Sequence, residues 1–352
     1  MTSSADPPDG SPLLVHQLVD PFALDLLPDQ PVAGGKEYAV PGQVVLLSRS
    51  VDAEFDDLQG RLDRLGVPSL RIDADRLEDV RLTVGIADLR PTVVWTRRFT
   101  RTAMPAAGSA IDALRNDSWL ALANRLAGLA TATLPGAPVG VLDQLAGARG
   151  LGIAVPATIV TTSPAEAAAA LPGDRVVLKV IDSHFVEPVP GRLYGIFAEV
   201  VERRELARRT SPGMPVIMQE FVPHEAEHRV YYCLGRLVAF DIRKSGPAAP
   251  WSDQPSVLVR PVEVLEPIAT AVLSLAAAWD LRFGAFDFLV ANGRAVFLEV
   301  NLTGDWRWYE SKAGTHAVSA MTAAAVLDLH LRARGAVRPR PAGFDLLSFL
   351  GA

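Results

Sequence analysis

The chain has 352 residues, long enough for two or three domains that each have a hydrophobic core. A net charge of -6 gives no general attraction to nucleic acids or anionic membranes, and a single cysteine, Cys233, excludes an internal disulfide framework and a cysteine-based metal site. The opening residues lack the basic and apolar segments of a secretory signal, and no apolar run approaches the roughly 18 residues of a membrane span. We therefore expect a cytoplasmic protein that binds neither nucleic acid nor membrane.

The first part of the chain alternates strand and helix patterns after a polar start. Residues 1–12 are rich in Ser, Pro and Asp, and we expect them to be disordered. The spacing of apolar residues predicts helices over 52–65 and 114–126. Apolar runs predict three strands, at 44–50, 69–75 and 91–98. This alternation is typical of a doubly wound α/β domain, which we assign to 13–138.

The second unit, assigned to 139–222, also mixes helices with strands. Ser163, followed by a proline and then by Glu166, predicts an N-capped helix over 163–171. Residues 183–195 contain Gly191 and Gly195 and are interpreted as a loop. Apolar runs predict strands within 150–162, 175–182 and 216–222.

The third unit, 223–335, is expected to be built on antiparallel strands. Residues 228–243 form two apolar runs around a turn at Leu234 and Gly235, and two more runs flank 291–293. Helices are predicted over 267–279 and 315–331. A tail rich in Pro and Arg occupies 336–352.

The hairpin from Ala285 to Asn301 has a register that its apolar pattern can select. A two-residue turn at Asn292 and Gly293 would place Asp287 on an apolar face. A three-residue loop over 291–293, with Gly293 left-handed in a bulge, pairs Val290 with Arg294 instead. We therefore predict the second register. It places six apolar residues on one face: Phe286, Phe288, Val290, Val296, Leu298 and Val300.

The other face of this hairpin carries Asp287, Glu299 and Asn301. Two carboxylates and an amide oxygen suit Mg²⁺, which binds one or two carboxylates and completes its octahedron with water and substrate phosphates. The alternative is an acidic strand face that is merely solvated. We predict a magnesium site.

Two cations and a short motif could complete a nucleotide site. Lys179 interrupts an apolar strand, where burial is costly without an anionic partner. Arg229 shares a strand face with Glu227 and offers a planar fork for phosphate or carboxylate. The backbone of the motif QEFV, residues 219–222, could face an adenine edge. The alternatives are a lysine at a sheet edge and an arginine in a surface ion pair.

These features occur in an order that resembles the ATP-grasp superfamily of carboxylate ligases: a strand lysine, a glycine loop, QEFV, E-x-R-V, an aspartate and FLEVN. Three stretches resemble the microviridin-type (graspetide) peptide maturases more closely: VVWTRR, EHRVYYCLG and FLEVNLTGDW. The resemblance covers roughly residues 40–330. It implies an α/β (α+β) fold with a doubly wound pre-ATP-grasp domain, a central lid subdomain and a C-terminal antiparallel sheet.

The resemblance also implies roles for individual residues. ATP would be bound by the phosphate-contacting Lys179 and Arg229, by Glu227 at the ribose or substrate, and by a pocket for adenine formed by Gln219, Glu220, Phe221 and Val222. Magnesium would be held by Asp287, Glu299 and Asn301. The loop 183–195 would close over the phosphates. Candidates for substrate contacts are Arg97, Arg98, Arg243 and Trp306.

One position departs from the family pattern. Members usually carry an Asn-Lys pair at the start of the helix that precedes the GLxVP turn, and this chain has Gly140 and Val141 there. A second phosphate-binding lysine is therefore missing or displaced. Cys233 is interpreted as a buried bystander, not as a nucleophile.

The implied reaction joins a carboxylate to a hydroxyl or an amine through an acyl phosphate, with release of ADP. In the peptide-maturing branch the partner is a ribosomal precursor peptide with a leader segment. Relatives are often dimers, so the resemblance also implies a homodimer. Two alternatives remain open: a ligase for small-molecule acids and amines, and a nucleotide- or peptide-binding protein without catalysis.

Overall fold

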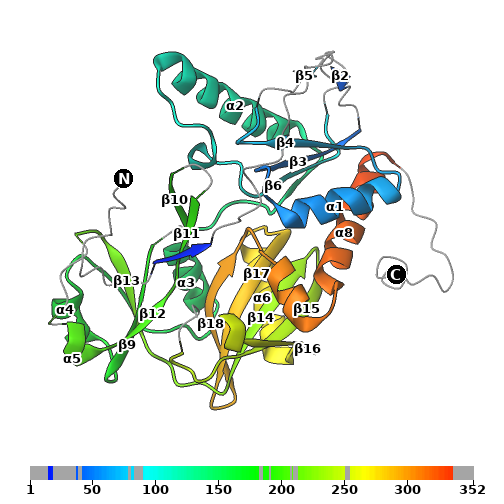
Figure 1. Ribbon diagram of the computed structural model, residues 1–352. Helices are drawn as coiled ribbons and strands as arrows, with labels where there is room; N and C mark the ends of the chain where they lie inside the picture. Colours follow the sequence, from blue (N-terminus) through cyan, green and yellow to red (C-terminus); the bar gives the residue numbers. More distant parts are fainter. Residues whose placement is uncertain are drawn as a thin grey trace.

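The computed structural model describes residues 42–77, 90–181, 196–206, 208, 213–249 and 254–335, with the backbone of short strands at 15–18, 37–38, 81–82, 185–189 and 192–195. The disorder expected for 1–12 and the tail at 336–352 lie outside the described residues. The larger sheets are two of four strands and one of five, and Figure 1 shows helices packed around them. None of the described helices is long and apolar enough to span a membrane.

The N-terminal sheet is parallel, with the strand order β4-β3-β6-β7. Its strands are β3 (Val44–Ser48), β4 (Ser69–Asp73), β6 (Val93–Thr96) and β7 (Ala132–Leu134). The helices α1 (Ala53–Arg64) and α2 (Ala110–Leu129) lie on opposite faces (Figure 1). The doubly wound prediction is confirmed. The short strand β7 was not predicted.

Alternate residues of β3 pack into two separate hydrophobic cores, one on each face of the sheet. Val44 and Leu46 pack with α1, whereas Val45 and Leu47 pack with Leu126 of α2. This explains the unbroken apolar run, because a parallel strand is covered on both faces. A further parallel pair joins β2 (Glu37–Tyr38) to β5 (Arg81–Leu82).

The central sheet is antiparallel, with the order β12-β9-β13-β8. Its strands are β8 (Thr158–Thr161), β9 (Arg175–Lys179), β12 (Glu199–Glu202) and β13 (Val216–Glu220). Two helices accompany it: α4 (Pro164–Ala167) and α5 (Arg203–Leu206). The α3 helix (Val141–Gly150) precedes β8 in the chain but packs against β18 (Arg294–Asn301), a strand of the C-terminal sheet.

The helix predicted over 163–171 is shorter than expected. The α4 helix ends at Ala167 and continues as a 3-10 turn over Ala168–Ala170. Among the described residues the Ser163 side chain caps no backbone N–H. The tighter turn brings Ala168 and Leu171 into the core of the central sheet, and that packing outweighs the capping signal.

The loop predicted over 183–195 is wrong for most of its length. It contains the strands β10 (Phe185–Val189) and β11 (Arg192–Ile196), which pair with each other, while β1 (Val15–Leu18) pairs with β11. The glycines and Pro188 obscured an aromatic and β-branched pattern that favours strands. Residues 183–184 and 190–191 lie outside the described part of the chain.

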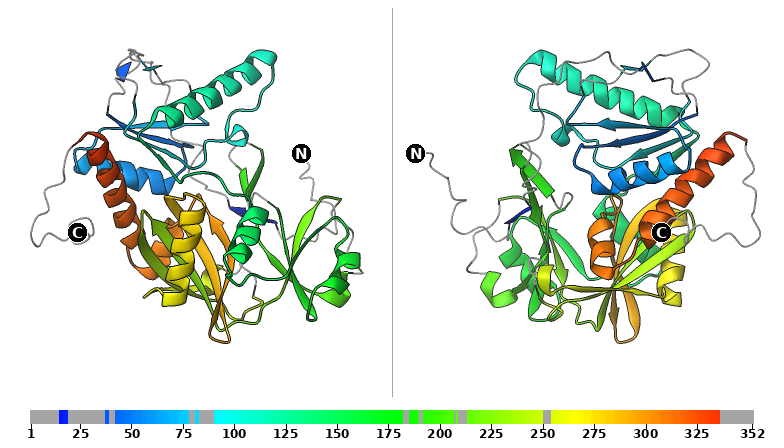
Figure 2. Two further views of the ribbon diagram at one scale, coloured as in Figure 1. Left: turned by 180° about the vertical axis from the view of Figure 1, so that it is seen from behind. Right: turned by 45° about the vertical axis from the view of Figure 1, so that its right-hand side comes forward.

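The C-terminal sheet is antiparallel and has five strands in the order β16-β15-β14-β17-β18. They are β14 (Ala226–Cys233), β15 (Arg236–Arg243), β16 (Leu258–Val262), β17 (Phe283–Ala291) and β18 (Arg294–Asn301). The helices are α6 (Glu266–Ala278), α7 (Arg307–Ala313) and α8 (Ala317–Ala333). Figure 2 shows α6 along one side of this sheet and α8 reaching from the sheet to α1.

The β17–β18 hairpin differs from the predicted register at its turn. Ala291 pairs with Arg294, so the turn has two residues, Asn292 at φ 50° and Gly293 at φ 72°. A bulge then shifts the register: Phe288 pairs with Phe297, but Asp287 pairs with Glu299. The extra residue between these two pairs is Leu298.

The bulge reconciles the turn with the predicted acidic face. Asp287 and Glu299 are cross-strand partners, and Asn301 follows two residues later on the same strand. The apolar prediction was wrong at Val296 and Leu298, because Ala295 and the fully buried Phe297 take the core positions of β18 before the bulge. The predicted acidic face is therefore correct, whereas the predicted three-residue loop is wrong.

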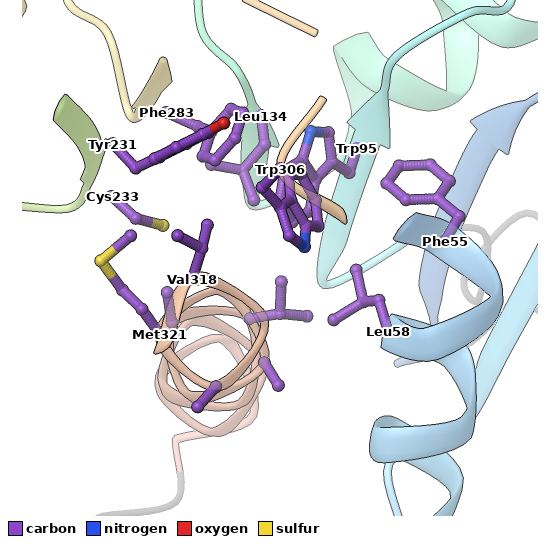
Figure 3. Close-up of a cluster of buried hydrophobic side chains, with 14 of the residues drawn as sticks. Phe55, Leu58, Trp95, Leu134, Tyr231, Cys233, Phe283, Trp306, Val318 and Met321 are labelled. Carbon is purple, nitrogen blue, oxygen red and sulfur yellow. The ribbon is translucent and has the colours of Figure 1, made fainter. Parts of the chain in front are cut away.

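The N-terminal and C-terminal sheets share one core. Trp95 of β6 lies against Trp306, with ring centroids 5.9 Å apart, and against Phe283 of β17 at 4.9 Å. Figure 3 shows these rings between α1 and α8, with Phe55 beside Trp95. Because all four rings are buried, this aromatic cluster fixes the two sheets relative to each other.

Candidate active site

A pocket of about 600 Å³ lies between the central and C-terminal sheets. Every residue predicted to bind nucleotide or metal lines it: Lys179, Gln219, Glu220, Phe221, Val222, Glu227, Arg229, Asp287, Glu299 and Asn301. The two sheets thus bring together residues that are far apart in the chain, such as Lys179 and Glu299, which lie 120 positions apart and are in contact.

Asp287 and Glu299 place two carboxylates next to each other on adjacent strands. Burial raises the pKa of Asp287 to about 6, with the Glu299 charge adding to the effect and Arg229 and Lys179 opposing it. Two carboxylates that resist simultaneous ionisation form a favourable site for a divalent cation.

Each of these carboxylates has a basic partner: that of Asp287 lies on the neighbouring strand β14, and that of Glu299 lies on β9 across the pocket. Arg229 Nη1 donates to both oxygens of Asp287, at 2.8 and 3.1 Å, and Lys179 Nζ donates to Glu299 Oε2 at 3.3 Å. Arg229 is further held by the Gly304 carbonyl at 2.8 Å and the Tyr231 hydroxyl at 3.0 Å. The guanidinium therefore has a fixed direction, which is a condition for electrostatic stabilisation of a developing charge.

Asn301 is turned toward its own chain. Its Oδ1 accepts hydrogen bonds from Thr303 N at 2.8 Å, Thr303 Oγ1 at 2.7 Å and Gly304 N at 3.2 Å. Within the described residues no group of three or more His, Cys, Asp and Glu side chains forms a metal site. Of the three residues predicted to bind magnesium, Asp287, Glu299 and Asn301 all line the pocket, but the Asn301 oxygen is engaged in the following turn.

The QEFV stretch forms one wall of the pocket and is anchored to β8. Glu220 Oε1 accepts from Ala157 N at 2.9 Å, and Gln219 Nε2 donates to Thr158 Oγ1 at 3.0 Å. Arg175 lies over the ring of Phe221, 4.1 Å from its centroid. The side chains of Gln219 and Glu220 thus fix the strand, while Phe221 presents a flat apolar surface of the kind that suits a base.

Sequence reasoning missed a third pocket cation, Lys244, and its neighbour His224. Lys244 Nζ lies 2.6 Å from Glu227 Oε1, and His224 Nε2 lies 3.0 Å from the same oxygen. Burial opposes ionisation of Glu227, but these partners outweigh it and lower the pKa of Glu227. Lys244 follows β15 in a loop, so its sequence resembles that of a surface lysine. Only the pairing of β14 with β15 brings it to Glu227.

The predicted substrate contacts divide into buried and accessible residues. Trp306 is fully buried and donates to Ser319 Oγ, and the Arg97 side chain is also fully buried, so neither reaches a substrate in this structure. Arg98 and Arg243 remain partly exposed, paired with Asp305 and Asp241. The two buried residues pack at the junction of the sheets because an aromatic cage surrounds the guanidinium.

Cys233 is fully buried, and burial raises the pKa of its thiol to about 12. A thiol that stays protonated is a poor nucleophile, as expected for a core residue.

No protein-family model matches the chain, and no curated protein sequence matches it. Solved structures do resemble it. Macrocyclase MdnC of Microcystis aeruginosa MRC, bound with precursor peptide MdnA, matches with a TM-score of 0.66 and 20% identity over 81% of this chain and 99% of that chain. A Chryseobacterium gregarium RiPP-associated ATP-grasp ligase, in complex with ADP and a leader and core peptide, matches with a TM-score of 0.66 and 20% identity over 81% and 96%.

The ATP-grasp ligase PsnB, complexed with a variant of its minimal precursor, Mg and ADP, matches with a TM-score of 0.63 and 18% identity over 82% of this chain and 98% of that chain. This chain has the ATP-grasp fold. In this protein, the central and C-terminal sheets face each other across the pocket, which Lys179 and Asp287 both line.

Proposed function

We propose that this protein is an ADP-forming ATP-grasp ligase that joins a carboxylate to a hydroxyl or amine in a ribosomal precursor peptide. The observation that carries the proposal is the pocket itself, in which three basic side chains oppose acidic ones. The pairs are Lys179–Glu299, Arg229–Asp287 and Lys244–Glu227. A polyphosphate can take the basic partners, and a divalent cation can take the carboxylates of the hairpin.

The donor set fits magnesium. Asp287 and Glu299 would hold the ion, and Asn301 would join them if its oxygen were shared with the following turn. When bound, magnesium neutralises phosphate charge. The fit rests on two hard oxygen donors that lie next to each other. Burial and the charge of Glu299 raise the pKa of Asp287, and a bound cation would offset this unfavourable interaction between the two carboxylates.

The chain's own groups provide binding and orientation. Lys179 and Lys244, which line the pocket, would bind phosphate oxygens, and Arg229 would bind the terminal phosphate and the acyl phosphate that follows. Phosphoryl transfer depends on alignment and charge stabilisation more than on covalent participation of the protein. The hydrogen bonds from Arg229 to the Gly304 carbonyl and the Tyr231 hydroxyl would therefore keep the guanidinium aligned for the reaction.

The peptide substrate is supported by the similar structures, which contain precursor, leader or core peptides. Incubation with ATP, magnesium and a candidate acidic peptide should remove one water per bond formed, as mass spectrometry would show. Turnover of small acids and amines with no modified peptide would instead support the small-molecule ligase.

Glu299→Gln tests the metal and nucleotide roles together. Removing this carboxylate should lower ADP formation by a factor of about 10²–10³, the range typical for one electrostatic contributor. Glu225→Gln is the matched control, because Glu225 is exposed and binds the hairpin turn through Asn292 N at 2.9 Å. Normal turnover by Glu299→Gln would refute the metal assignment.

The proposal includes the division of the chain into 13–138, 139–222 and 223–335, a cytoplasmic location and a homodimer. Light scattering on the purified chain tests the dimer, because a monomer at all concentrations would contradict it.

A further inference from the structure

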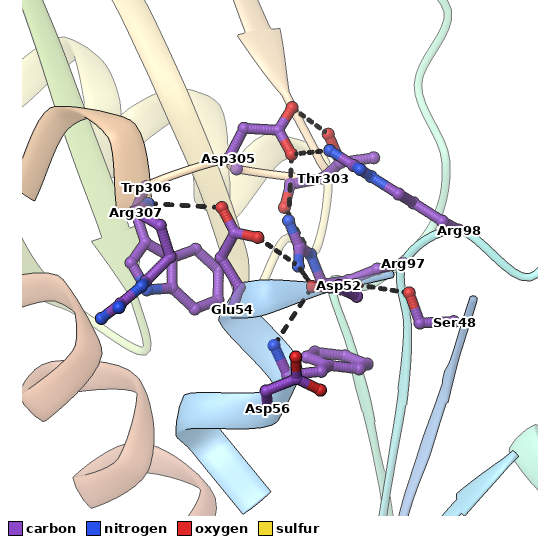
Figure 4. Close-up of polar contacts among 12 residues, drawn as sticks. Ser48, Asp52, Glu54, Asp56, Arg97, Arg98, Thr303, Asp305, Trp306 and Arg307 are labelled. Atoms are coloured by element: carbon purple, nitrogen blue, oxygen red, sulfur yellow. Dashed lines mark hydrogen bonds and ion pairs between the residues drawn. The ribbon is translucent and has the colours of Figure 1, made fainter. Parts of the chain in front are cut away.

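The N-terminal sheet has a crevice where ligands usually bind in doubly wound domains. The chain continues from β3 to β4 at one side and from β6 to β7 at the other, so the strand order reverses between β3 and β6. The space outside the carboxyl ends of such strands is the usual ligand position. In this protein the turn at residues 301–306 of the C-terminal sheet fills that space (Figure 4).

Arg97, which directly follows β6, is the main contact between the crevice and the turn. Its Nε donates to the Thr303 carbonyl at 2.8 Å, and its Nη2 lies 3.0 Å from Asp305 Oδ1. Its Nη1 binds Asp52, which also caps α1 by accepting from Phe55 N at 3.1 Å. One guanidinium thus joins the start of α1 to the turn.

Aromatic rings enclose this guanidinium. The centroids of the Phe55 and Trp306 rings lie 5.3 and 4.9 Å from Arg97 Cζ. Arg98 also pairs with Asp305 Oδ1, and Thr303 Oγ1 lies 3.0 Å from Asp305 Oδ2. Burial opposes ionisation of Asp305, but the charges of Arg98 and Arg97 outweigh it and lower the pKa of Asp305 to about 2.

One residue of this turn, Asp305, has a backbone conformation that is unfavourable for a residue with a side chain. Gly304 has φ 85° and Asp305 has φ 48°, and residues other than glycine rarely adopt the left-handed region. Asp305 is therefore held in a conformation that its two arginine partners help to maintain.

The same turn reaches the pocket. The Gly304 carbonyl accepts from Arg229 Nη2 at 2.8 Å, and the Asp305 carbonyl accepts from the Tyr231 hydroxyl at 3.4 Å. Asp305 itself lines the pocket. One peptide therefore separates the Asp305 carboxylate, fixed by the N-terminal domain, from the carbonyl that orients Arg229.

We propose that Asp305, held by Arg97 and Arg98, is a positioning residue that keeps Arg229 directed at the terminal phosphate of the nucleotide. The N-terminal domain thereby controls the nucleotide site through the 301–306 turn. This inference rests on the proposed function, because it assigns Arg229 to that phosphate.

The test compares two ligands that differ in the terminal phosphate. Isothermal titration calorimetry measures binding of magnesium with AMPPNP and of magnesium with ADP. Asp305→Asn should weaken AMPPNP binding roughly tenfold, the scale of one charge-assisted hydrogen bond, and leave ADP affinity within about twofold. Arg229→Lys should show the same selectivity. In that background Asp305→Asn should add little, because residues that act through one another are not additive.

Asp73→Asn is the matched control, since Asp73 also pairs with a buried arginine, Arg71, in the N-terminal sheet and has a similarly exposed side chain. It should change neither affinity. Arg98→Gln supplies a second, milder variant that keeps the Arg97–Asp305 pair if thermal unfolding shows that Asp305→Asn is not folded.

Equal loss of both ligands, no loss, or full additivity with Arg229→Lys would overturn this inference alone. If the wild-type protein bound neither ligand, the proposed function would fall as well.

Discussion

The Asp287 carboxylate has a neighbouring carboxylate and a neighbouring arginine, so its charge depends on pH close to neutrality. Because burial raises its pKa to about 6, the carboxyl group becomes protonated as the pH falls through that value. Metal ligands must be deprotonated, so the proton and magnesium compete for this oxygen pair.

We therefore predict that the magnesium-dependent part of nucleotide affinity falls below pH 6, by at most roughly tenfold per pH unit. Calorimetry between pH 5 and pH 8, as a test range of about three units, would measure it. Nucleotide binding without magnesium serves as the control. A magnesium effect that stayed constant down to pH 5 would show that Asp287 ionises normally or does not bind the ion.

At this scale the sequence indicated most of the pocket. Asp287, Glu299, Lys179 and Arg229 stand out because charged residues interrupt apolar strands, and the structure places all four in one pocket. Lys244 carried no such signal, since it lies in a polar loop. Arg97 and Trp306 were assigned to the substrate, but packing of the guanidinium between aromatic rings takes them into the interior.

Among the elements, the β17–β18 hairpin shows how two local irregularities cooperate. The tight turn at Asn292 and Gly293 alone would place Asp287 on the core side, and the bulge at Leu298 restores it to the pocket side. The alternation of apolar residues predicted which face carries Asp287, but not how the hairpin achieves it. A three-residue loop and a two-residue turn followed by a bulge both place Asp287 on the same face. Short strands such as β7 were missed, since three residues give no periodicity.

Two glycines of this region should differ in their tolerance of alanine. Gly293 has φ 72° with no atom within 4 Å of an added Cβ, so Gly293→Ala should cost about 1 kcal/mol of unfolding free energy. Gly304 has φ 85°, and its added Cβ would lie 2.6 Å from Phe283 Cζ. Gly304→Ala should therefore cost about 3 kcal/mol. Chemical denaturation would measure both, and equal values would contradict the described turn at 301–306.

For the whole molecule, the important feature is that an ion pair spans the pocket. Lys179 belongs to the central sheet and Glu299 to the C-terminal sheet, 3.3 Å apart. Magnesium bound to Glu299 alone would leave Lys179 without its ion-pair partner, and phosphate bound to Lys179 alone would leave Glu299 without its partner. When both ligands bind, each of the two side chains has a ligand of opposite charge. The two ligands should therefore assist each other.

We predict that magnesium raises nucleotide affinity by about 5- to 150-fold, the usual range of such coupling, and that Lys179→Met reduces this factor. Titration of ADP at several magnesium concentrations would measure the coupling. Lys312→Met is a suitable control, because Lys312 is exposed and lies over the Trp308 ring. An unchanged factor in Lys179→Met would remove this explanation.

The stacked pair of Trp95 and Trp306 has a practical consequence. The rings come from the N-terminal sheet and from the turn beside the C-terminal sheet, and both are fully shielded from water. Indole emission shifts to longer wavelengths when water reaches the ring, so the natural fluorescence of this protein should report any separation of those two parts without an added dye.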